Sequence, residues 1–277
     1  MITRLRNIGP ARWVLIIVGL LVLIIAIWPG LFTSNDPHAI DSNAILQLPS
    51  FAHPFGTDEA GADVLSRILY ATRLELSIAV GSMLIGFLIG LPTGLIAGYS
   101  NKFVDAAFSG MAAATLAFPL ILFAILMVAS LGTTTISLVG IIGFLFFPRV
   151  FLLIRAQTKS LKEREFIEAT RVIGVSSTRI LFRHILPNAT GPLLNLVPQM
   201  MAEALLVEAG LSYLGLGVQL PDATWGTILQ NSKRFYVTSP AYAVIAGLTI
   251  TAAAALLLWA GELISESTNP LKRGRRL

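Results

Sequence analysis

The sequence predicts an all-α polytopic membrane protein with six transmembrane helices. Of its 277 residues, 55% are hydrophobic and only 13% are charged, and the mean hydropathy of +0.77 lies outside the range of soluble domains. Six mainly apolar runs are long enough to cross a hydrocarbon core of roughly 30 Å. Lys and Arg are also distributed unevenly between the segments that join these runs, as in multi-pass membrane proteins.

The six apolar runs follow one another along the whole chain. The third is long enough to tilt or to break at Pro119, and Pro198 is expected to kink the fifth. The predicted spans are Arg12–Phe32, Leu76–Tyr99, Phe103–Leu131, Thr135–Ile154, Thr190–Leu211 and Pro240–Ile264.

The start of the chain resembles a secretory signal, because Arg4, Arg6 and Arg12 precede an apolar stretch. That stretch is long, ends in Trp28-Pro29-Gly30 and lacks a small-x-small cleavage site. We therefore expect an uncleaved anchor that forms the first span.

A long segment, Thr33–Glu75, separates the first span from the second. From Asp63 onward, apolar residues recur at helical spacing with Arg67 and Arg73 opposite them, which predicts an interfacial amphipathic helix with snorkelling arginines. Residues 1–75 are thus expected to hold the first span and an external loop. Residues 76–277 are expected to form a five-helix core, with an internal loop at about 155–189, an external segment at about 212–239 and a basic tail.

The distribution of basic residues predicts the orientation. With both termini on the cytoplasmic side, sixteen of the twenty Lys and Arg residues lie inside, and the positive-inside rule is satisfied. The outer side keeps only Arg67, Arg73, Lys233 and Arg234. Because this asymmetry accounts for the pI near 9.8, the basic charge does not indicate nucleic-acid binding.

The internal loop contains a charged helix-turn-helix, Glu168–Pro187, called the elbow below. Gly174 can adopt the positive φ that ends a first short helix, and Ser176 or Ser177 can cap a second. Pro187 marks where the second helix stops and the next span starts. A basic, water-facing elbow between spans suits a membrane subunit that receives force from a soluble motor.

The elbow resembles the E-A-A loop of permease subunits in binding-protein-dependent ABC importers. Glu168, Ala169, Gly174, Leu186 and Pro187 match that pattern. Thr170 occupies the second small position, and His184 stands where the general pattern has Ile. The resemblance implies a type I importer permease fold in which these residues form a cytoplasmic coupling helix that docks on an ATPase subunit.

Two further stretches resemble the oligopeptide/dipeptide/nickel branch and its second, C-type, permease. An external motif begins at Phe55, with Ala62 where Arg is usual; its matching residues are Gly56, Thr57, Asp58, Gly61, Asp63, Ser66 and Arg67. From Ala202 the chain is similar to the branch's A-E-x-x-L-x-E-x-x-L-S-F-L-G-L-G pattern, with Glu203 and Glu208 matching and Tyr213 for Phe. The tail, 261–270, only loosely resembles the branch's ending.

The resemblance implies partners and a solute class. The partners would be a second, homologous permease in a heterodimer, two ATPase subunits that bind ATP and Mg, an extracytoplasmic solute-binding protein, and the lipid bilayer of a bacterial cytoplasmic membrane. The solute would be a di- or oligopeptide carried by alternating access, with nickel or another small solute as alternatives. No cofactor or metal is expected on this chain.

Glu203 and Glu208 lie in an apolar run, where a carboxylate is costly unless it faces protein or water. Five residues apart on a helix, they point about 140° apart and cannot form one paired-carboxylate site. Each is a candidate either for the translocation path or for a subunit interface. A self-contained transporter that uses one of them for proton coupling is the alternative from a different class.

Other chemistry has little support in the sequence. Asp58, Glu59 and Asp63 are expected to form a solvated loop face or a helix cap rather than a cation site. The three histidines lack the spacing of a metal site. The chain has no cysteine, no phosphate-binding G-x-x-x-x-G-K-[ST] loop, no H-E-x-x-H and no G-x-S-x-G. It is therefore expected not to be an enzyme or to hydrolyse ATP itself.

Overall fold

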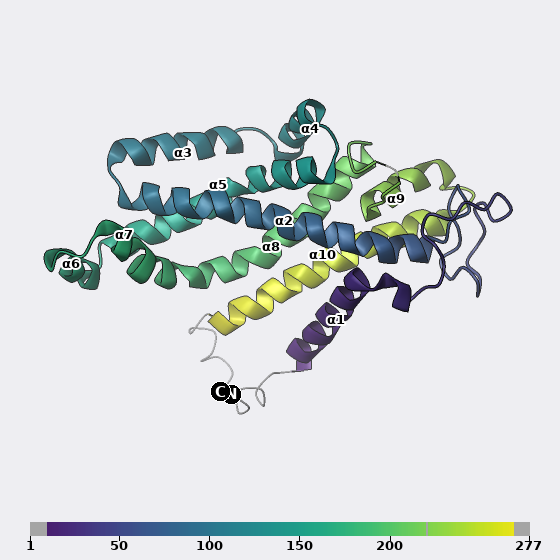
Figure 1. The fold of residues 1–277 in the computed structure, drawn as a ribbon, viewed down its shortest axis with the longest axis horizontal. Helices are drawn as coiled ribbons and strands as arrows, with labels where there is room; N and C mark the ends of the chain where they lie inside the picture. The colour runs from purple at the N-terminus through teal and green to yellow at the C-terminus, as the bar shows by residue number, and fades with distance from the viewer. Residues whose placement is uncertain (1–9, 220, 269–277) are drawn as a thin grey trace.

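The structure, a computed structural model, describes residues 10–219 and 221–268 as an elongated helical bundle (Figure 1). The long helices are α1 (Pro10–Ile27), α2 (Val64–Tyr99), α5 (Thr135–Lys162), α8 (Leu186–Tyr213) and α10 (Pro240–Thr268). The shorter ones are α3 (Lys102–Leu116), α4 (Leu120–Leu131), α6 (Glu165–Val172), α7 (Ser177–Ile180) and α9 (Trp225–Ser232). Single turns lie at η2 (Pro29–Leu31), η3 (Leu181–Ile185, π-helical) and η4 (Lys233–Phe235). Thr57 and Asp63 form an isolated β-bridge.

The prediction of a mainly helical membrane fold is confirmed. Among the described residues, α1, α2, α5 and α10 are each long and apolar enough to span a membrane. The bent pair α3–α4 gives a fifth span if it is counted as one. The predicted fifth span, α8, is not among these helices because polar residues such as Asn195, Glu203 and Glu208 interrupt its apolar sequence. It packs against α2, α5 and α10 in the bundle.

The long third run does break at proline. The helix α3 ends at Leu116 and α4 begins at Leu120, and the two are bent by 92°. Pro119 occupies the N-cap of α4, where its missing N–H and fixed φ are tolerated. The helix α8, by contrast, continues past Pro198.

The helix expected from Asp63 onward begins at Val64 and is not separate from the second span. One unbroken helix, α2, runs for 36 residues from Val64. Arg67 does not snorkel at a membrane surface: it is 8% exposed and pairs with the fully buried Asp58. Because its charge is neutralised inside the protein, the helix can enter the bundle without an interfacial turn. Arg73 instead donates to the carbonyls of Ala26 and Ile27 at the end of α1.

A stripe of glycines brings α2 and α5 into close contact. A Cβ added at Gly90 would lie 2.6 Å from the carbonyl oxygen of Phe147, and one at Gly94 would lie 2.8 Å from that of Phe151. Gly98 lies as closely against Thr158. Small residues four apart let membrane helices approach backbone to backbone, and this pair forms the centre of the core.

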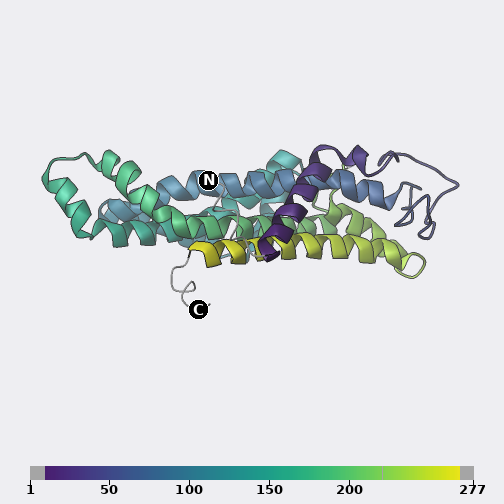
Figure 2. The same cartoon turned by 90° about the horizontal axis from the view of Figure 1, so that it is seen from below.

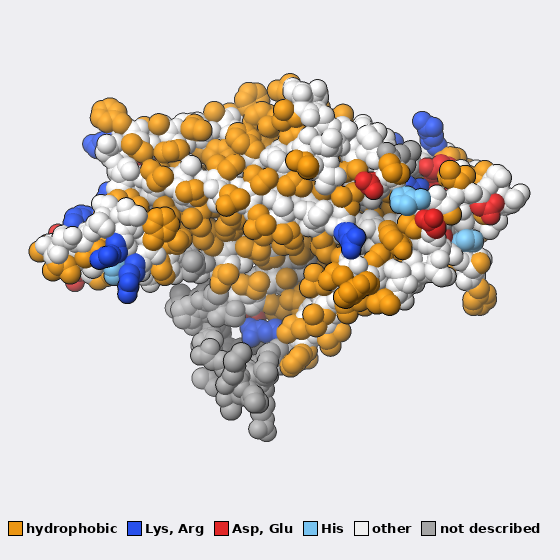
Figure 3. Space-filling model, in the orientation of Figure 1, with side chains coloured by type: hydrophobic (Ala, Val, Ile, Leu, Met, Phe, Trp, Pro, Cys, Tyr) orange, Lys and Arg blue, Asp and Glu red, His pale blue; other side chains and the backbone are white. Residues whose placement is uncertain are grey.

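Polar and apolar side chains separate along the long axis. Hydrophobic side chains cover the middle of the face in Figure 3, and the visible Asp and Glu gather at the end near residues 33–63. Lys and Arg are the main charges at the opposite end, where α6 and α7 project beyond the bundle in Figures 1 and 2. Arg4, Arg6 and the basic tail, whose positions bear on the orientation, lie outside the described residues.

Candidate functional site

The elbow forms two short helices, α6 and α7, joined by a tight bend. Gly174 adopts a φ of +82°, as its predicted role in ending the first helix requires. Ser176 occupies the N-cap of α7 with extended backbone angles, although its side chain makes no capping hydrogen bond. The chain therefore reverses direction within a few residues because glycine permits the left-handed turn there.

Pro187 does not separate the elbow from the next span. From Ser177 the chain stays helical through α7, the π-helical η3 and α8, and Pro187 lies in the first turn of α8. His184 lies in η3, and Leu186 is the first residue of α8. A local π-helical turn such as η3 is one way in which a helix accommodates a proline, so Pro187 does not end the helical path. The elbow thus runs directly into α8.

The inner side of the elbow is held against the bundle. Ile167, Ile180 and Ile185 are fully buried and belong to the main hydrophobic core. The guanidinium of Arg171 lies 5.8 Å from the ring centre of Tyr99 at the end of α2, and the ammonium of Lys162 lies 5.2 Å from it. These cation–π contacts tie α6 to the ends of both α2 and α5.

The outer side of the elbow is exposed and unusually apolar. Val172 is 82% exposed and Ile173 is 78% exposed, and both adjoin Gly174 at the tip of the bend. Phe182 is also exposed. Glu168 and Ala169 are exposed on α6, while Thr170 donates to the carbonyl of Ile167 at 2.7 Å. An exposed apolar patch rimmed by charge is typical of a protein–protein contact surface.

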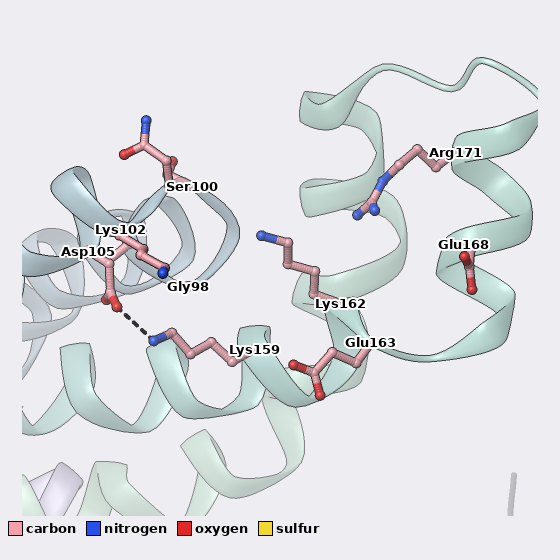
Figure 4. A pocket seen from close by; sticks show the side chains of 11 residues that line it. Gly98, Ser100, Lys102, Asp105, Lys159, Lys162, Glu163, Glu168 and Arg171 are labelled. Carbon is pink, nitrogen blue, oxygen red and sulfur yellow. Dashed lines mark hydrogen bonds and ion pairs between the residues drawn. The ribbon is translucent and has the colours of Figure 1, made fainter.

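A cavity of about 500 Å³ lies between the elbow and the turn that joins α2 to α3. Lys162 and Arg171 extend into it, and Asp105 faces Lys159 across 2.7 Å (Figure 4). Asp105 also accepts from Arg155. The other lining residues are Ala97, Gly98, Ser100, Asn101, Lys102, Glu163 and Glu168. Asp105 belongs to none of the motifs in the sequence, and its partners lie some fifty residues away on α5.

Glu203 pairs with Arg149, which lies near the middle of α5. The Nη2 of Arg149 donates to Oε1 of Glu203 at 2.9 Å, and its Nη1 also contacts this carboxylate. Arg149 lies within the predicted fourth span, Thr135–Ile154, and the structure places it well inside α5. Both side chains keep some exposure, 46% for Arg149 and 27% for Glu203. This charged surface between α5 and α8 is available to a path or to a neighbouring subunit.

Glu208 faces a different neighbour, as the predicted angular separation from Glu203 requires. It is fully buried, accepts from Ser212 Oγ at 2.6 Å and interacts with the carboxyl group of Glu75 on α2. Glu75 in turn accepts from the backbone N–H of Trp225 at 2.7 Å. Glu75 was not predicted as a site residue, although an acid inside a helical apolar pattern is a usable signal.

The motif that begins at Phe55 builds a folded loop at the N-terminal end of α2. Asp58 accepts from the backbone N–H of Ala60 and of Ala62 at 2.8 Å and pairs with Arg67. Asp63 caps α2 by accepting from Ser66 N. The motif is therefore a cap and a buried ion pair, and the expectation of a solvated face is wrong for Asp58.

Other residues of this loop are also held by close packing or by hydrogen bonds. Gly56 has a φ of +77°, and a Cβ there would lie 2.4 Å from the carbonyl oxygen of Gln47. Thr57 is buried and accepts from Gln47 N at 2.8 Å. Tyr242 on α10 donates to Glu59 at 3.0 Å. No group of three potential metal ligands occurs in the part of the chain that the structure describes.

Apolar spanning helices that carry a projecting, partly apolar elbow define the membrane-embedded permease class of transporter subunits. Residues 90–268 match the family of binding-protein-dependent transport system inner membrane components. The chain belongs to that family, and it is a multi-pass inner membrane component.

Similar proteins carry names consistent with this class. The chain is 37% identical over 240 residues to the dipeptide transport system permease protein DppC of Alkalihalophilus pseudofirmus, covering 85% of this chain and 79% of that protein. It is 34% identical to the glutathione transport system permease protein GsiD of Pectobacterium atrosepticum, covering 83% and 77% respectively. A putative peptide transport system permease of Brucella suis is 32% identical, covering 93% and 86%.

A solved structure shares the fold. The MetNI methionine ABC transporter in inward-facing conformations has a chain that matches with a TM-score of 0.57. The match covers 74% of this chain and 96% of that chain at 18% sequence identity. The expected importer-permease fold is therefore confirmed.

Proposed function

We propose that this chain is one of two permease subunits in an ATP-driven importer of di- and oligopeptides. The observation that carries the proposal is the elbow, whose buried side packs on the bundle while Val172 and Ile173 face outward without cover in the described structure. The peptide solute is supported by the names of the relatives, which include dipeptide and peptide permeases. ATP and Mg would bind to separate ATPase subunits, and a solute-binding protein would deliver the peptide.

The connections of the elbow suggest how force would reach the membrane. At one end α6 follows α5 closely, and at the other end α7 continues through η3 into α8. Closure of the ATPase subunits on ATP would move the elbow, and with it α5 and α8, as a unit. Because Arg149 and Glu203 bridge those two helices, the pair would move with them between outward- and inward-open states. We propose that this pair lines the path or the interface with the second permease.

The orientation follows from the same arrangement. We infer that the elbow end is cytoplasmic, together with both termini, and that the loop at residues 33–63 and the segment at 212–239 are outside. The support is the concentration of Lys and Arg at the elbow end.

Single cysteines test this orientation, because the chain has none of its own. Cys at Ser42 or Asn231 is expected to react with an impermeant thiol reagent added outside intact cells. Cys at Ser160, which is also exposed, is expected to react only after the membrane is permeabilised. Labelling of the Ser160 variant alone in intact cells would invert the topology.

The mass of the intact, detergent-solubilised complex tests the assembly. One elbow provides one docking point, whereas a motor of two ATPase subunits needs two. We expect one copy of this chain, one homologous permease and two ATPase subunits. Two copies of this chain without a second permease would refute the heterodimer, and this chain alone would refute the importer.

The same complex in proteoliposomes identifies the solute. ATP-dependent uptake of a labelled dipeptide, with the binding protein supplied, is expected to be competed by unlabelled peptides and not by nickel. Uptake of nickel instead would leave the importer intact but overturn the peptide assignment. Uptake driven by a proton gradient without ATP would favour a self-contained transporter.

A further inference from the structure

Glu75 and Glu208 form a carboxyl pair that the proposed transport mechanism does not use. They come from different helices, α2 and α8, and are 1% and 0% exposed. Each Oε1 has a clear donor: Trp225 N for Glu75, and Ser212 Oγ for Glu208. The two carboxyl groups interact directly. Each nevertheless leaves its Oε2 buried without a hydrogen-bond partner among the described residues.

Two buried carboxyl groups that each leave one oxygen without a donor among the described residues point to a shared proton. If both groups were ionised, two like charges would lie buried together, which is strongly unfavourable in a low dielectric. A single proton shared by the two groups removes one charge and makes one carboxyl group a donor to the other. Acid–carboxylate pairs of this kind share one proton because both members cannot ionise when they are in contact.

Each carboxyl group also has donors outside the pair. Glu75 accepts from the first backbone N–H of α9 and lies at the N-terminus of that helix, where negative charge is stabilised. Glu208 accepts from Ser212 Oγ at 2.6 Å, and Thr224 and Glu75 are its further hydrogen-bond partners. Either group can therefore carry the charge while the other holds the proton.

The surrounding charges all have partners of their own. On α2, Arg67 pairs with Asp58 and Arg73 binds the end of α1. On α5, Arg149 pairs with Glu203. Tyr242 of α10 donates to Glu59, and Lys233 after α9 lies over the Tyr213 ring. No Lys or Arg from these elements is among the groups that act on the carboxyl pair.

The pair lies where the external segment joins the bundle. Trp225 donates its backbone N–H to Glu75 and its indole N–H to the carbonyl of Ile68 at 3.0 Å. Gly226 lies so close to α8 that a Cβ there would be 2.7 Å from Ala209 Cα. The packing of α9 on α2 and α8 thus depends on whether the two carboxyl groups share a proton.

We propose that Glu75 and Glu208 bind one shared proton, and that this proton keeps α9 docked on the bundle. Loss of the proton leaves two facing carboxylates, which repel each other and release the external segment. The pair is a proton-binding site on the outer half of the protein, and it stands whether or not the solute is a peptide.

A buried thiol on α9 tests the proposal in the intact complex. Ile228 is fully buried on α9, whereas Ser42 is exposed on the outer loop. The labelling rate of Ile228→Cys is divided by that of Ser42→Cys at each pH, which removes the pH dependence of thiol reactivity. The labelled fraction of this chain is measured by mass spectrometry. The ratio is expected to rise with pH, by up to about tenfold per pH unit once the pair loses its proton.

Glu208→Gln supplies the matched variant, because its amide can donate to Glu75 but cannot lose a proton. We expect it to keep Ile228→Cys protected at every pH. Glu262→Gln, which makes the same change at an exposed acid on α10, is expected to behave as the unmodified complex does. A ratio independent of pH, or exposure in Glu208→Gln, would overturn the proposal.

Two further measurements distinguish a bound proton from a bound metal cation at this site. Infrared spectroscopy is expected to show the carbonyl band of a neutral carboxylic acid in the unmodified protein and its loss in Glu208→Gln. An unchanged spectrum contradicts the shared proton even if the variant folds poorly. Protection that depends on added Na⁺ or K⁺ at fixed pH would assign the site to a metal cation instead.

Discussion

Reversing the charge of Glu168 is expected to abolish ATP-dependent uptake while the protein remains in the membrane. In Glu168→Lys a cation replaces an exposed acid on α6, next to the apolar tip formed by Val172 and Ile173. A like charge placed in a charge-complementary interface costs about 2–5 kcal/mol, which corresponds to a loss of roughly thirtyfold or more in uptake. Because Glu168 makes no contact that the core requires, the amount of inserted protein should not change.

A second variant reaches the same surface through the backbone. Gly174 has a φ of +82° and open space around its Cβ position. Gly174→Val therefore creates no clash, but it places a β-branched residue in the left-handed region at a cost of about 1–3 kcal/mol. The bend should distort, and uptake by Gly174→Val should fall as it does in Glu168→Lys.

The measurements are uptake, the amount of this chain in the membrane, and the amount of ATPase that copurifies with it. Glu165→Lys is the matched control, because it makes the same charge change on the exposed side of the same helix but lies outside the motif. It is expected to retain most of the uptake. Normal uptake in both Glu168→Lys and Gly174→Val would remove the basis for a coupling elbow.

Local signals explain why the elbow and the broken third run were predictable. At Gly174 the positive φ depends on the residue itself, and at Pro119 the lost N–H and fixed φ set the break. Such effects need no distant partner. A short pattern of residue types was therefore sufficient to predict both features.

The errors arose where a distant partner decides the outcome. The sequence pattern predicts that Arg67 is an interfacial cation, whereas the structure pairs it with Asp58. The pairing of Arg149 with Glu203 joins α5 to α8 across more than fifty residues of sequence. Glu75 and Glu208 are far apart in the sequence, and the binding of Glu75 to Trp225 spans 150 positions. A single sequence records none of these pairings.

The glycine stripe was missed for a related reason. Glycine is common in membrane helices, and four-residue spacing becomes meaningful only when the opposing surface is known. On α2, Gly90 and Gly94 meet the backbone of α5 at Phe147 and Phe151. The contact lets two long helices pack without side chains between them, and much of the core is built on it.

Gly90→Leu is therefore expected to prevent stable folding of the permease. Its Cβ alone would lie 2.6 Å from both the Phe147 carbonyl oxygen and Val150 Cβ, and 2.9 Å from Phe151 N. Neither backbone atom can move without separating α2 from α5. The cost should reach about 3 kcal/mol or more, against a typical total stability of 5–15 kcal/mol.

Gly110→Leu on α3 is the matched control, because nothing lies within 4 Å of its Cβ position. The measurement is the fraction of this chain that stays monodisperse after detergent extraction and the temperature at which it aggregates. We expect Gly90→Leu to be degraded or aggregated and Gly110→Leu to resemble the unmodified protein. Equal recovery of the two variants would mean that α2 and α5 do not meet at the distance described, and the packing of the whole bundle around them would have to be revised.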